Sequence, residues 1–304
     1  MMRRLLLNRA GATAAILGVA LLLGGCTPQV SGAPPAADHT PQAPRPTLMP
    51  QAPPAAPPVP LAGLDDRVEQ AAAQAADVGA QIEAAVLDRQ TGQLAAHGAN
   101  TPFPIASVVK LFIADDLLLR ESQGDIELSA ADRQSLDTML RSSDDSAAQM
   151  FWDRSGQNAV IDRIVARYGL TGTTAPYNGH WDVTQSTAGD LVRYYDMLLA
   201  GTGGLPREQA DTIIGNIARF TPTGNDGYPQ RFGIPDGLYA EPVAVKQGWF
   251  CCWNGGNQLH VSTGLIGPDR RYVMAISSLD PTDAATAREH ITEAVKTVFP
   301  GGTV

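Results

Sequence analysis

Apolar residues along this chain follow two patterns between residues 62 and 304. In "IEAAVLDRQTGQLAAHGAN", apolar and polar positions alternate on both sides of "DRQTGQ", which predicts a hairpin. Alternation returns in "PVAVKQGWF", "NQLHVSTGLIG" and "RYVMAISSL", which predict three further strands. Helical spacing predicts helices over Leu64–Ala76, Ile105–Arg120, Ala131–Arg141, Ser146–Arg154, Gln157–Tyr168, Ala188–Leu199, Arg207–Ile217 and Asp283–Phe299.

The order of these elements predicts the fold class. Strands occur at both ends of residues 62–304, helices occupy the middle, and no internal repeat is present. We therefore expect an α+β fold in which one antiparallel sheet of about five strands is built from both ends, with flanking helices and a mostly helical insertion. A segment of this length can bury a core as one large domain or as two interleaved subdomains.

The first residues have the composition of an export signal. Arg3, Arg4 and Arg9 precede an apolar stretch that ends in "LLGGC". A transmembrane anchor is the alternative, although the apolar stretch is short for a span of about 20 residues. "LLGGC" resembles the lipobox of bacterial lipoproteins, and the resemblance implies cleavage after residue 25 and lipid on Cys26. We expect the protein to be held by this lipid at the extracytoplasmic face of the cell membrane.

The next segment is rich in proline. Thr27–Pro60 holds 12 prolines in 34 residues and almost no large apolar side chains. Such a composition buries too little surface to offset its ordering entropy, so we predict that residues 26–61 are a disordered tether behind the lipid anchor. A proline-rich ligand for a partner domain is the alternative.

The net charge argues against nucleic-acid binding, and the spacing of the histidines argues against a metal site. The net charge is −9, and cleavage after residue 25 removes three arginines and no acid, leaving −12. The sequence has no basic patch of the kind that indicates nucleic-acid binding. The five histidines are scattered without metal spacing, so we expect no metal and no cofactor. We also expect a monomer.

The use of lysine points to a candidate site. The chain has 19 Arg but only three Lys, namely Lys110, Lys246 and Lys296. A buried lysine can lose its proton, whereas arginine stays charged. Lys110 follows Ser107 by three residues in "SVVKLF", so the two side chains share one helix face. On its own, this pair is also compatible with an ordinary helix start.

Two further segments extend the pattern. "SSDDSAAQ" at 142–149 joins the end of one predicted helix to the start of the next, and "KQG" at 246–248 lies on a predicted strand. In order, the three segments resemble the S-x-x-K, S-D-N and K-T-G motifs of the penicillin-recognising serine enzymes, the class A β-lactamases and related penicillin-binding proteins. The resemblance covers most of residues 64–299.

This resemblance implies catalytic roles for four residues. Ser107 would attack an amide or lactam carbonyl, and Lys110 would be its base, since a serine hydroxyl needs an adjacent base. Ser143 would relay a proton to the leaving nitrogen. Lys246 would support that proton path and attract a substrate carboxylate.

The resemblance also implies an oxyanion hole and a substrate edge. The backbone N–H groups of Ser107 and Trp249 would bind the oxyanion. Gly248 would leave room for substrate to lie against the strand. Trp249 and Trp253 flank "CC" and are expected in the core or the pocket wall, with stacking on a sugar as an alternative.

The chain departs from the family pattern at two substrate-binding positions. Asp145 replaces the usual Asn, and an ionised carboxylate cannot donate to a substrate carbonyl. It would also stabilise the charged form of Lys110. Gln247 replaces the usual Thr or Ser. A register of Ser142 with Asp144 is the alternative, but "SAA" after Asp145 favours the register that begins at Ser143.

A third departure concerns hydrolysis. Class A β-lactamases have a glutamate between the second and third motifs that activates the deacylating water. This chain has no Glu from Leu128 to Arg207, and Asp182 is the only acid between Leu170 and Gly189. Rapid β-lactam hydrolysis by that route is therefore not expected.

The sequence leaves three functions open. The first is a serine hydrolase that forms an acyl-enzyme with a β-lactam or a cell-wall-related amide. The second is a binding protein of the same fold with a degraded site, which Asp145 and the missing Glu favour. The third is an esterase that uses the same Ser–Lys pair. Cys251 and Cys252 are the only cysteines after Cys26, and export permits either a disulfide between these neighbours or two reduced thiols.

Overall fold

The computed structural model describes residues 61–304. The expected signal, Cys26 and nearly all of the expected tether lie outside the described residues. Among residues 61–304, no helix combines the length and the apolar character needed to cross a bilayer.

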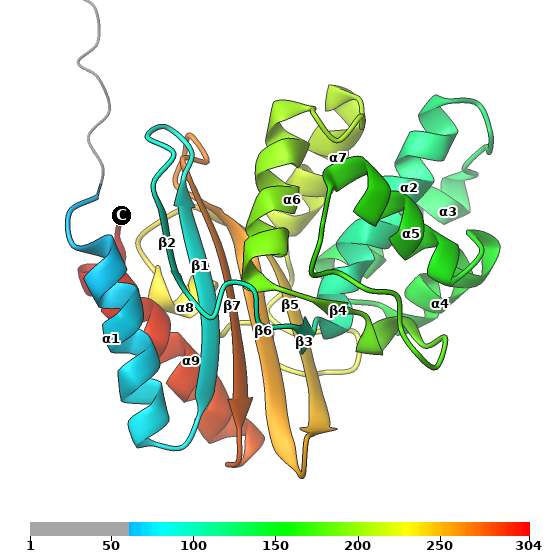
Figure 1. The fold of residues 1–304 in the computed structure, drawn as a ribbon. Helices are drawn as coiled ribbons and strands as arrows, with labels where there is room; N and C mark the ends of the chain where they lie inside the picture. The colour runs from blue at the N-terminus through cyan, green and yellow to red at the C-terminus, as the bar shows by residue number, and fades with distance from the viewer. Residues whose placement is uncertain (1–60) are drawn as a thin grey trace, which may run out of the picture. The chain divides into compact units, whose positions relative to one another are not determined.

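A five-stranded antiparallel sheet forms the centre of the fold, in the order β2-β1-β7-β6-β5 (Figure 1). β1 pairs with β2 on one side and with β7 on the other, so the early hairpin joins the strands from the end of the chain. This confirms the predicted sheet built from both ends. The strands are β1 (Gln81–Asp88), β2 (Leu94–His97), β5 (Val243–Trp253), β6 (Asn257–Ile266) and β7 (Tyr272–Asp280).

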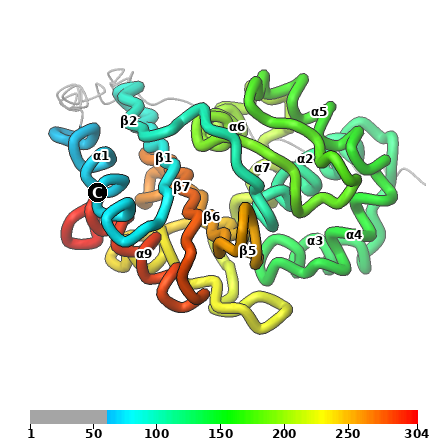
Figure 2. The backbone as a smooth tube through the Cα atoms, turned by 60° about the horizontal axis from the view of Figure 1, so that its bottom comes forward, coloured from blue at the N-terminus to red at the C-terminus, as the bar shows by residue number. Residues whose placement is uncertain are grey.

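Helices cover both faces of the sheet. α1 (Leu64–Asp77) and α9 (Ala284–Val298) lie on one face, and the helices between residues 110 and 217 lie on the other (Figures 1 and 2). The alternation along β7 serves both layers, since Val273 and Ala275 belong to one buried cluster and Met274 and Ile276 to the other. A strand buried on both faces needs this nearly continuous apolar run.

Apart from the helix predicted to begin at Ile105, the predicted helices are present with ends that differ by at most one residue. Ser129 begins one of them through a capping box with Asp132, and the Asp144 and Thr187 side chains accept backbone N–H bonds at the starts of two others. The helices of this layer are α2 (Lys110–Ser122), α3 (Ala130–Arg141), α4 (Asp145–Arg154), α5 (Asn158–Tyr168), α6 (Ala188–Ala200) and α7 (Arg207–Ile217).

One predicted helix is divided in the structure. The pattern from Ile105 to Arg120 predicted a single helix, but a 3₁₀ turn, η1 (Ala106–Val109), precedes α2. Ser107 therefore lies on the turn, and Lys110 is the first residue of α2. Five shorter elements were not predicted, because each contains too few residues for a periodic pattern. They are β3 (Phe103–Pro104), η2 (Trp181–Val183), β4 (Gln185–Ser186), α8 (Ile234–Gly237) and η3 (Pro300–Gly302).

A buried carboxylate fixes α2 against its neighbours. Asp115 is fully buried. It accepts hydrogen bonds from the guanidinium of Arg167 and the hydroxyl of Tyr168, both on α5, and from Tyr194 of α6 at 3.2 Å. Because α2 also carries Lys110, this network sets the position of the helix that delivers Lys110.

We expect Asp115→Ala to destabilise the domain by about 3–5 kcal/mol, because it leaves the Arg167 guanidinium without its carboxylate partner in a largely buried position. Denaturant unfolding followed by circular dichroism measures the change. Asp66→Asn, at an exposed residue of α1, is the matched control and should change stability by less than about 0.5 kcal/mol. Equal stability of the two variants would show that the network does not hold α2.

Candidate active site

Ser107 and Lys110 are in direct contact. The Lys110 Nζ donates to the Ser107 Oγ at 2.8 Å, and both residues are buried. The 3₁₀ turn brings the hydroxyl and the ammonium together over three residues and leaves Ser107 at the wall of a cavity. This is the geometry that an activated serine nucleophile requires.

Lys110 has two other acceptors. Its Nζ donates to the backbone oxygen of Ser143 at 2.7 Å and to the Oδ1 of Asp145 at 2.5 Å. Three acceptors match the three N–H groups of an ammonium, so the arrangement suits the protonated form of Lys110. Burial lowers the pKa of Lys110, and the carboxylate of Asp145 acts in the opposite direction.

Ser143 links Lys110 to the second buried lysine. The Lys246 Nζ donates to the Ser143 Oγ and to the backbone oxygen of Gln247 at 3.1 Å. The Ser143 hydroxyl donates to the Oε1 of Gln230 at 3.1 Å. Burial and the neighbouring charge of Lys110 hold the pKa of Lys246 well below its ordinary value. A lysine in this state can exchange a proton with a hydroxyl.

The structure distinguishes between the two possible registers of "SSDDS". The Ser142 hydroxyl donates to the backbone oxygen of Thr138 inside α3, and Asp144 caps α4 by accepting from the Ala147 N–H. Their side chains are therefore used within helix ends. Ser143 and Asp145 are the pair that meets the lysines.

Gln230 contributes to the cluster and was not identified from the sequence. It is buried, and its amide nitrogen donates to the backbone oxygens of Arg141 and Thr221, both at 2.9 Å. These bonds orient its Oε1 toward Ser143. No motif contains Gln230, and only the packing of residues 219–234 against α3 brings it there.

Gly248 lies against the turn that carries Ser107. A Cβ at this position would lie 2.6 Å from the backbone oxygen of Ile105 and 3.2 Å from the backbone nitrogen of Ser107. The space where a Cβ would lie is therefore filled by the turn that carries Ser107, and glycine allows β5 to approach that turn. This approach brings the backbone of Ser107 beside β5, next to Trp249.

Gln247 points away from the cavity. It is buried, and its amide nitrogen donates to the backbone oxygens of Gln230 at 3.1 Å and Phe232 at 2.6 Å. The amide nitrogen of Gln247 thus has its hydrogen-bond acceptors in residues 230–232. Asp145 and Trp249, in contrast, line the cavity.

The cavity beside Ser107 has a volume of about 300 Å³. Trp249 forms one wall, stacked on Tyr228 with a centroid separation of 5.1 Å, and its indole N–H donates to Asp226 at 3.2 Å. The other lining residues are Ala106, Asp145, Trp181, Asp182, Asp226 and Phe250. Asp182, the acid noted in the sequence, thus lies in the same cavity as Ser107.

Two non-glycine residues of the site have left-handed backbones. Ala106 has φ 45° and Ser143 has φ 55°. Such conformations cost about 1–3 kcal/mol each and persist where the surroundings fix them. Both positions directly orient a member of the Ser107–Lys110–Ser143 cluster, and no sequence signal indicated them.

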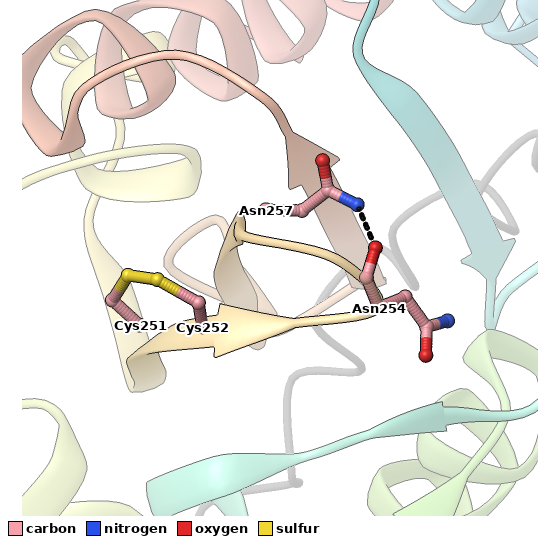
Figure 3. The surroundings of a disulfide bond; sticks show 4 residues. All are labelled: Cys251, Cys252, Asn254 and Asn257. Carbon is pink, nitrogen blue, oxygen red and sulfur yellow. Dashed lines mark hydrogen bonds between the residues drawn. A yellow bond between two sulfur atoms is a disulfide. The ribbon is translucent and has the colours of Figure 1, made fainter.

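Cys251 and Cys252 are joined by a disulfide near the end of β5 (Figure 3). Both residues are exposed, and the pairing of β5 with β6 shifts between Cys251 and Trp253. Asn257 donates to the backbone oxygen of Asn254 at 3.0 Å in the turn that follows. Within residues 61–304, no group of three or more His, Cys, Asp or Glu side chains could hold a metal ion.

Comparisons with known proteins agree with this fold. The sequence profile of the Beta-lactamase enzyme family matches residues 132–300, a stretch that begins after Ser107 and Lys110. The chain is also 58% identical over 255 residues to proteins of Mycobacterium bovis and Mycobacterium tuberculosis named "Putative lipoprotein LppW", which covers 84% of this chain and 81% of theirs.

Solved structures of low sequence identity share the fold. One is a class A β-lactamase from Mycobacterium abscessus, with 22% identity, a TM-score of 0.60 and coverage of 76% of this chain and 97% of that chain. Another is a PBP-A variant in an acyl-enzyme complex with penicillin G, with 19% identity, a TM-score of 0.65 and coverage of 81% and 98%. A β-lactamase from Sphaerobacter thermophilus has 18% identity, a TM-score of 0.62 and coverage of 78% and 97%.

We expect neither Cys251 nor Cys252 of the exported protein to react with a thiol label after unfolding, unless a reductant is added first. Both side chains are exposed and joined to each other, so only the disulfide protects them from the label. Mass spectrometry of the unfolded chain, with and without prior reduction, counts the labels. Two labels on these residues without reduction would rule out the disulfide.

Proposed function

Because this chain belongs to the Beta-lactamase enzyme family, we propose that it is a membrane-anchored lipoprotein whose domain carries out serine acyl transfer through Ser107. The substrate is a β-lactam or an amide related to cell-wall peptide. The observation that carries the proposal is the 2.8 Å hydrogen bond between the Lys110 Nζ and the Ser107 Oγ at the wall of a cavity.

The proposed reaction uses the two lysines as proton carriers. After Lys110 loses its proton, it accepts the proton of the Ser107 hydroxyl as the Oγ attacks the substrate carbonyl carbon. The backbone N–H groups of Ser107 and Trp249 bind the oxyanion. The C–N bond then breaks, and Ser143, in contact with Lys246, passes a proton to the leaving nitrogen. The product is an ester between Ser107 and the acyl group.

Release of that acyl group needs a base for the attacking water. Residues 128–207 contain no Glu. Asp182 is an acid in the wall of the cavity, but its side chain is one methylene shorter than that of Glu. We therefore expect slow deacylation and a persistent adduct.

One observation favours a second candidate, a binding protein without turnover. The ion pair between Asp145 and Lys110, with an Nζ–Oδ1 distance of 2.5 Å, stabilises the protonated lysine and so opposes its action as a base. In that case the cavity would hold a cell-wall peptide or a partner without forming a covalent bond.

The proposed anchor is lipid on Cys26. Its support is the basic and apolar leader that ends in "LLGGC" and the relatives of 58% identity that are named as lipoproteins. The proline-rich residues up to 61 would hold the domain away from the extracytoplasmic face of the membrane.

We expect intact-mass spectrometry to detect slow acylation of the wild-type domain by a β-lactam, at Ser107 and with an adduct that persists for hours. Lys110→Arg should abolish acylation, because guanidinium keeps the charge but cannot accept a proton. Asp145→Asn should accelerate it, because it removes the carboxylate that stabilises protonated Lys110 and restores an amide donor.

Ser107→Ala is the control and should take up no mass. An adduct on that variant would contradict the assignment of the nucleophile. If wild type forms no adduct with any β-lactam or ester probe, the binding protein becomes the better description. Reaction with an ester probe but with no β-lactam would indicate the esterase alternative.

We expect Cys26→Ala to move the protein from the membrane fraction to a soluble or unprocessed form, because the thiol is the proposed site of lipid attachment. Cell fractionation followed by mass spectrometry of the mature amino terminus makes the measurement. A wild-type protein without lipid on Cys26 would contradict the anchor.

A further inference from the structure

The cavity beside Ser107 is lined by acids. Asp145, Asp182 and Asp226 all lie in its wall, and no basic side chain does. The three carboxylates come from the start of α4, the turn η2 and the loop before α8, so they meet only in the folded domain. A cavity of about 300 Å³ therefore presents one sign of charge next to the proposed nucleophile.

Much of this negative charge is not neutralised by basic side chains of the protein. Asp226 accepts hydrogen bonds from the Tyr228 N–H and the Trp249 indole, which are uncharged donors. Within residues 61–304, neither Asp182 nor Asp226 forms a salt bridge. Asp145 binds Lys110 through Oδ1 only, and its side chain is 67% exposed. Its second oxygen is thus open to a ligand.

The lysines lie beneath the cavity, and Lys110 balances part of this charge through its ion pair with Asp145. Lys110 and Lys246 are buried, and neither lines the cavity. Lys246 bonds to Ser143, and burial and the charge of Lys110 hold its pKa well below the ordinary value. Gln247, at the usual Thr or Ser position, has its amide nitrogen bonded to backbone oxygens. Few groups remain that could attract a substrate carboxylate here.

The aromatic side chains of the cavity suit the same kind of ligand. The Lys110 Nζ already lies 4.8 Å from the centroid of the Trp181 ring. Trp249 adds a second indole to the lining. An ammonium group is attracted by the face of an indole ring as well as by carboxylates.

We propose that the acyl donor of this site carries an ammonium group, held by the carboxylates of Asp145, Asp182 and Asp226 beside the carbonyl that Ser107 attacks. This inference rests on the proposed function and names its substrate class: an amine-bearing amide or lactam. A substrate ammonium at Asp145 would also compete with Lys110 for that carboxylate. Binding of the correct substrate thus makes Lys110 easier to deprotonate.

Three penicillins, which share the same β-lactam ring system, test whether the site prefers a positively charged acyl side chain. Ampicillin, benzylpenicillin and carbenicillin differ at the side-chain α-carbon, which carries an ammonium, a hydrogen and a carboxylate, respectively. We expect wild type to be acylated by ampicillin at least about tenfold faster than by carbenicillin, which corresponds to about 1.4 kcal/mol. Benzylpenicillin should be intermediate, and added salt should narrow the differences. Equal rates, or the reverse order, would overturn the inference.

Asp226→Asn is the most informative variant, because Asp226 contacts none of Ser107, Lys110, Ser143 and Lys246. It should reduce the ratio of ampicillin to carbenicillin rates severalfold, because one of the three carboxylates proposed to hold the ammonium loses its charge. Asp66→Asn removes the same charge from α1, across the sheet, and should leave the ratio unchanged. An unchanged ratio in Asp226→Asn would overturn the role of this residue.

A binding measurement separates this inference from the proposed chemistry. Ser107→Ala cannot be acylated at this position, and calorimetry compares its affinity for acetyl-lysyl-D-alanyl-D-alanine with that for the same peptide acetylated on the lysine side chain. We expect the free amine to bind about tenfold more tightly. If no penicillin acylates wild type but this preference is found, the acyl-transfer proposal fails and the amine preference stands. If the three penicillins acylate wild type at equal rates and the two peptides bind equally, the acyl-transfer proposal stands and the amine preference fails.

Discussion

The candidate site depends on the burial of two lysines in one cluster. An ammonium removed from water needs acceptors on all its N–H groups, or it loses its proton. Lys110 has three acceptors, on Ser107, Ser143 and Asp145. Lys246 has a hydroxyl and a backbone oxygen but no carboxylate, and burial and the charge of Lys110 hold its pKa well below the ordinary value. The two lysines thus differ in their hydrogen-bond partners, and Ser143 contacts both of them.

The fold provides the rigidity that this cluster requires. α2 is fixed by Asp115, whose partners lie on α5 and α6. β5 is held at the sheet edge by β6, and Gly248 lets it approach the turn that carries Ser107. The site therefore joins the helical layer to the sheet, and a shift of either would separate Lys110 from Lys246. The left-handed backbones at Ala106 and Ser143 are tolerated because both layers constrain them.

Asp145 links the Ser107–Lys110 pair to the cavity. In the family pattern this position is an amide, and here it is a carboxylate that binds Lys110 and faces an acidic cavity. The same residue weakens the base in the resting state and offers a counter-ion to a cationic ligand. In the proposed reaction, the charge of the ligand and the action of Lys110 as a base are therefore linked through one side chain. This linkage is the physical difference between the domain and a site built to attract carboxylates.

The sequence by itself determined the architecture and the central residues of the site. Periodicity of two and of 3.6 identified most strands and helices, because each pattern records which faces of an element are buried. The scarcity of lysine identified Lys246 and Lys110, with Ser107 one turn before Lys110, and the resemblance to the family's three motifs added Ser143. The structure brings these four residues together. Tertiary structure alone decided the 3₁₀ turn under Ser107, the part played by Gln230, the close approach at Gly248 and the meeting of Asp182 with Asp226. Local patterns do not contain these features, because they arise from contacts between loops and layers that are distant along the chain.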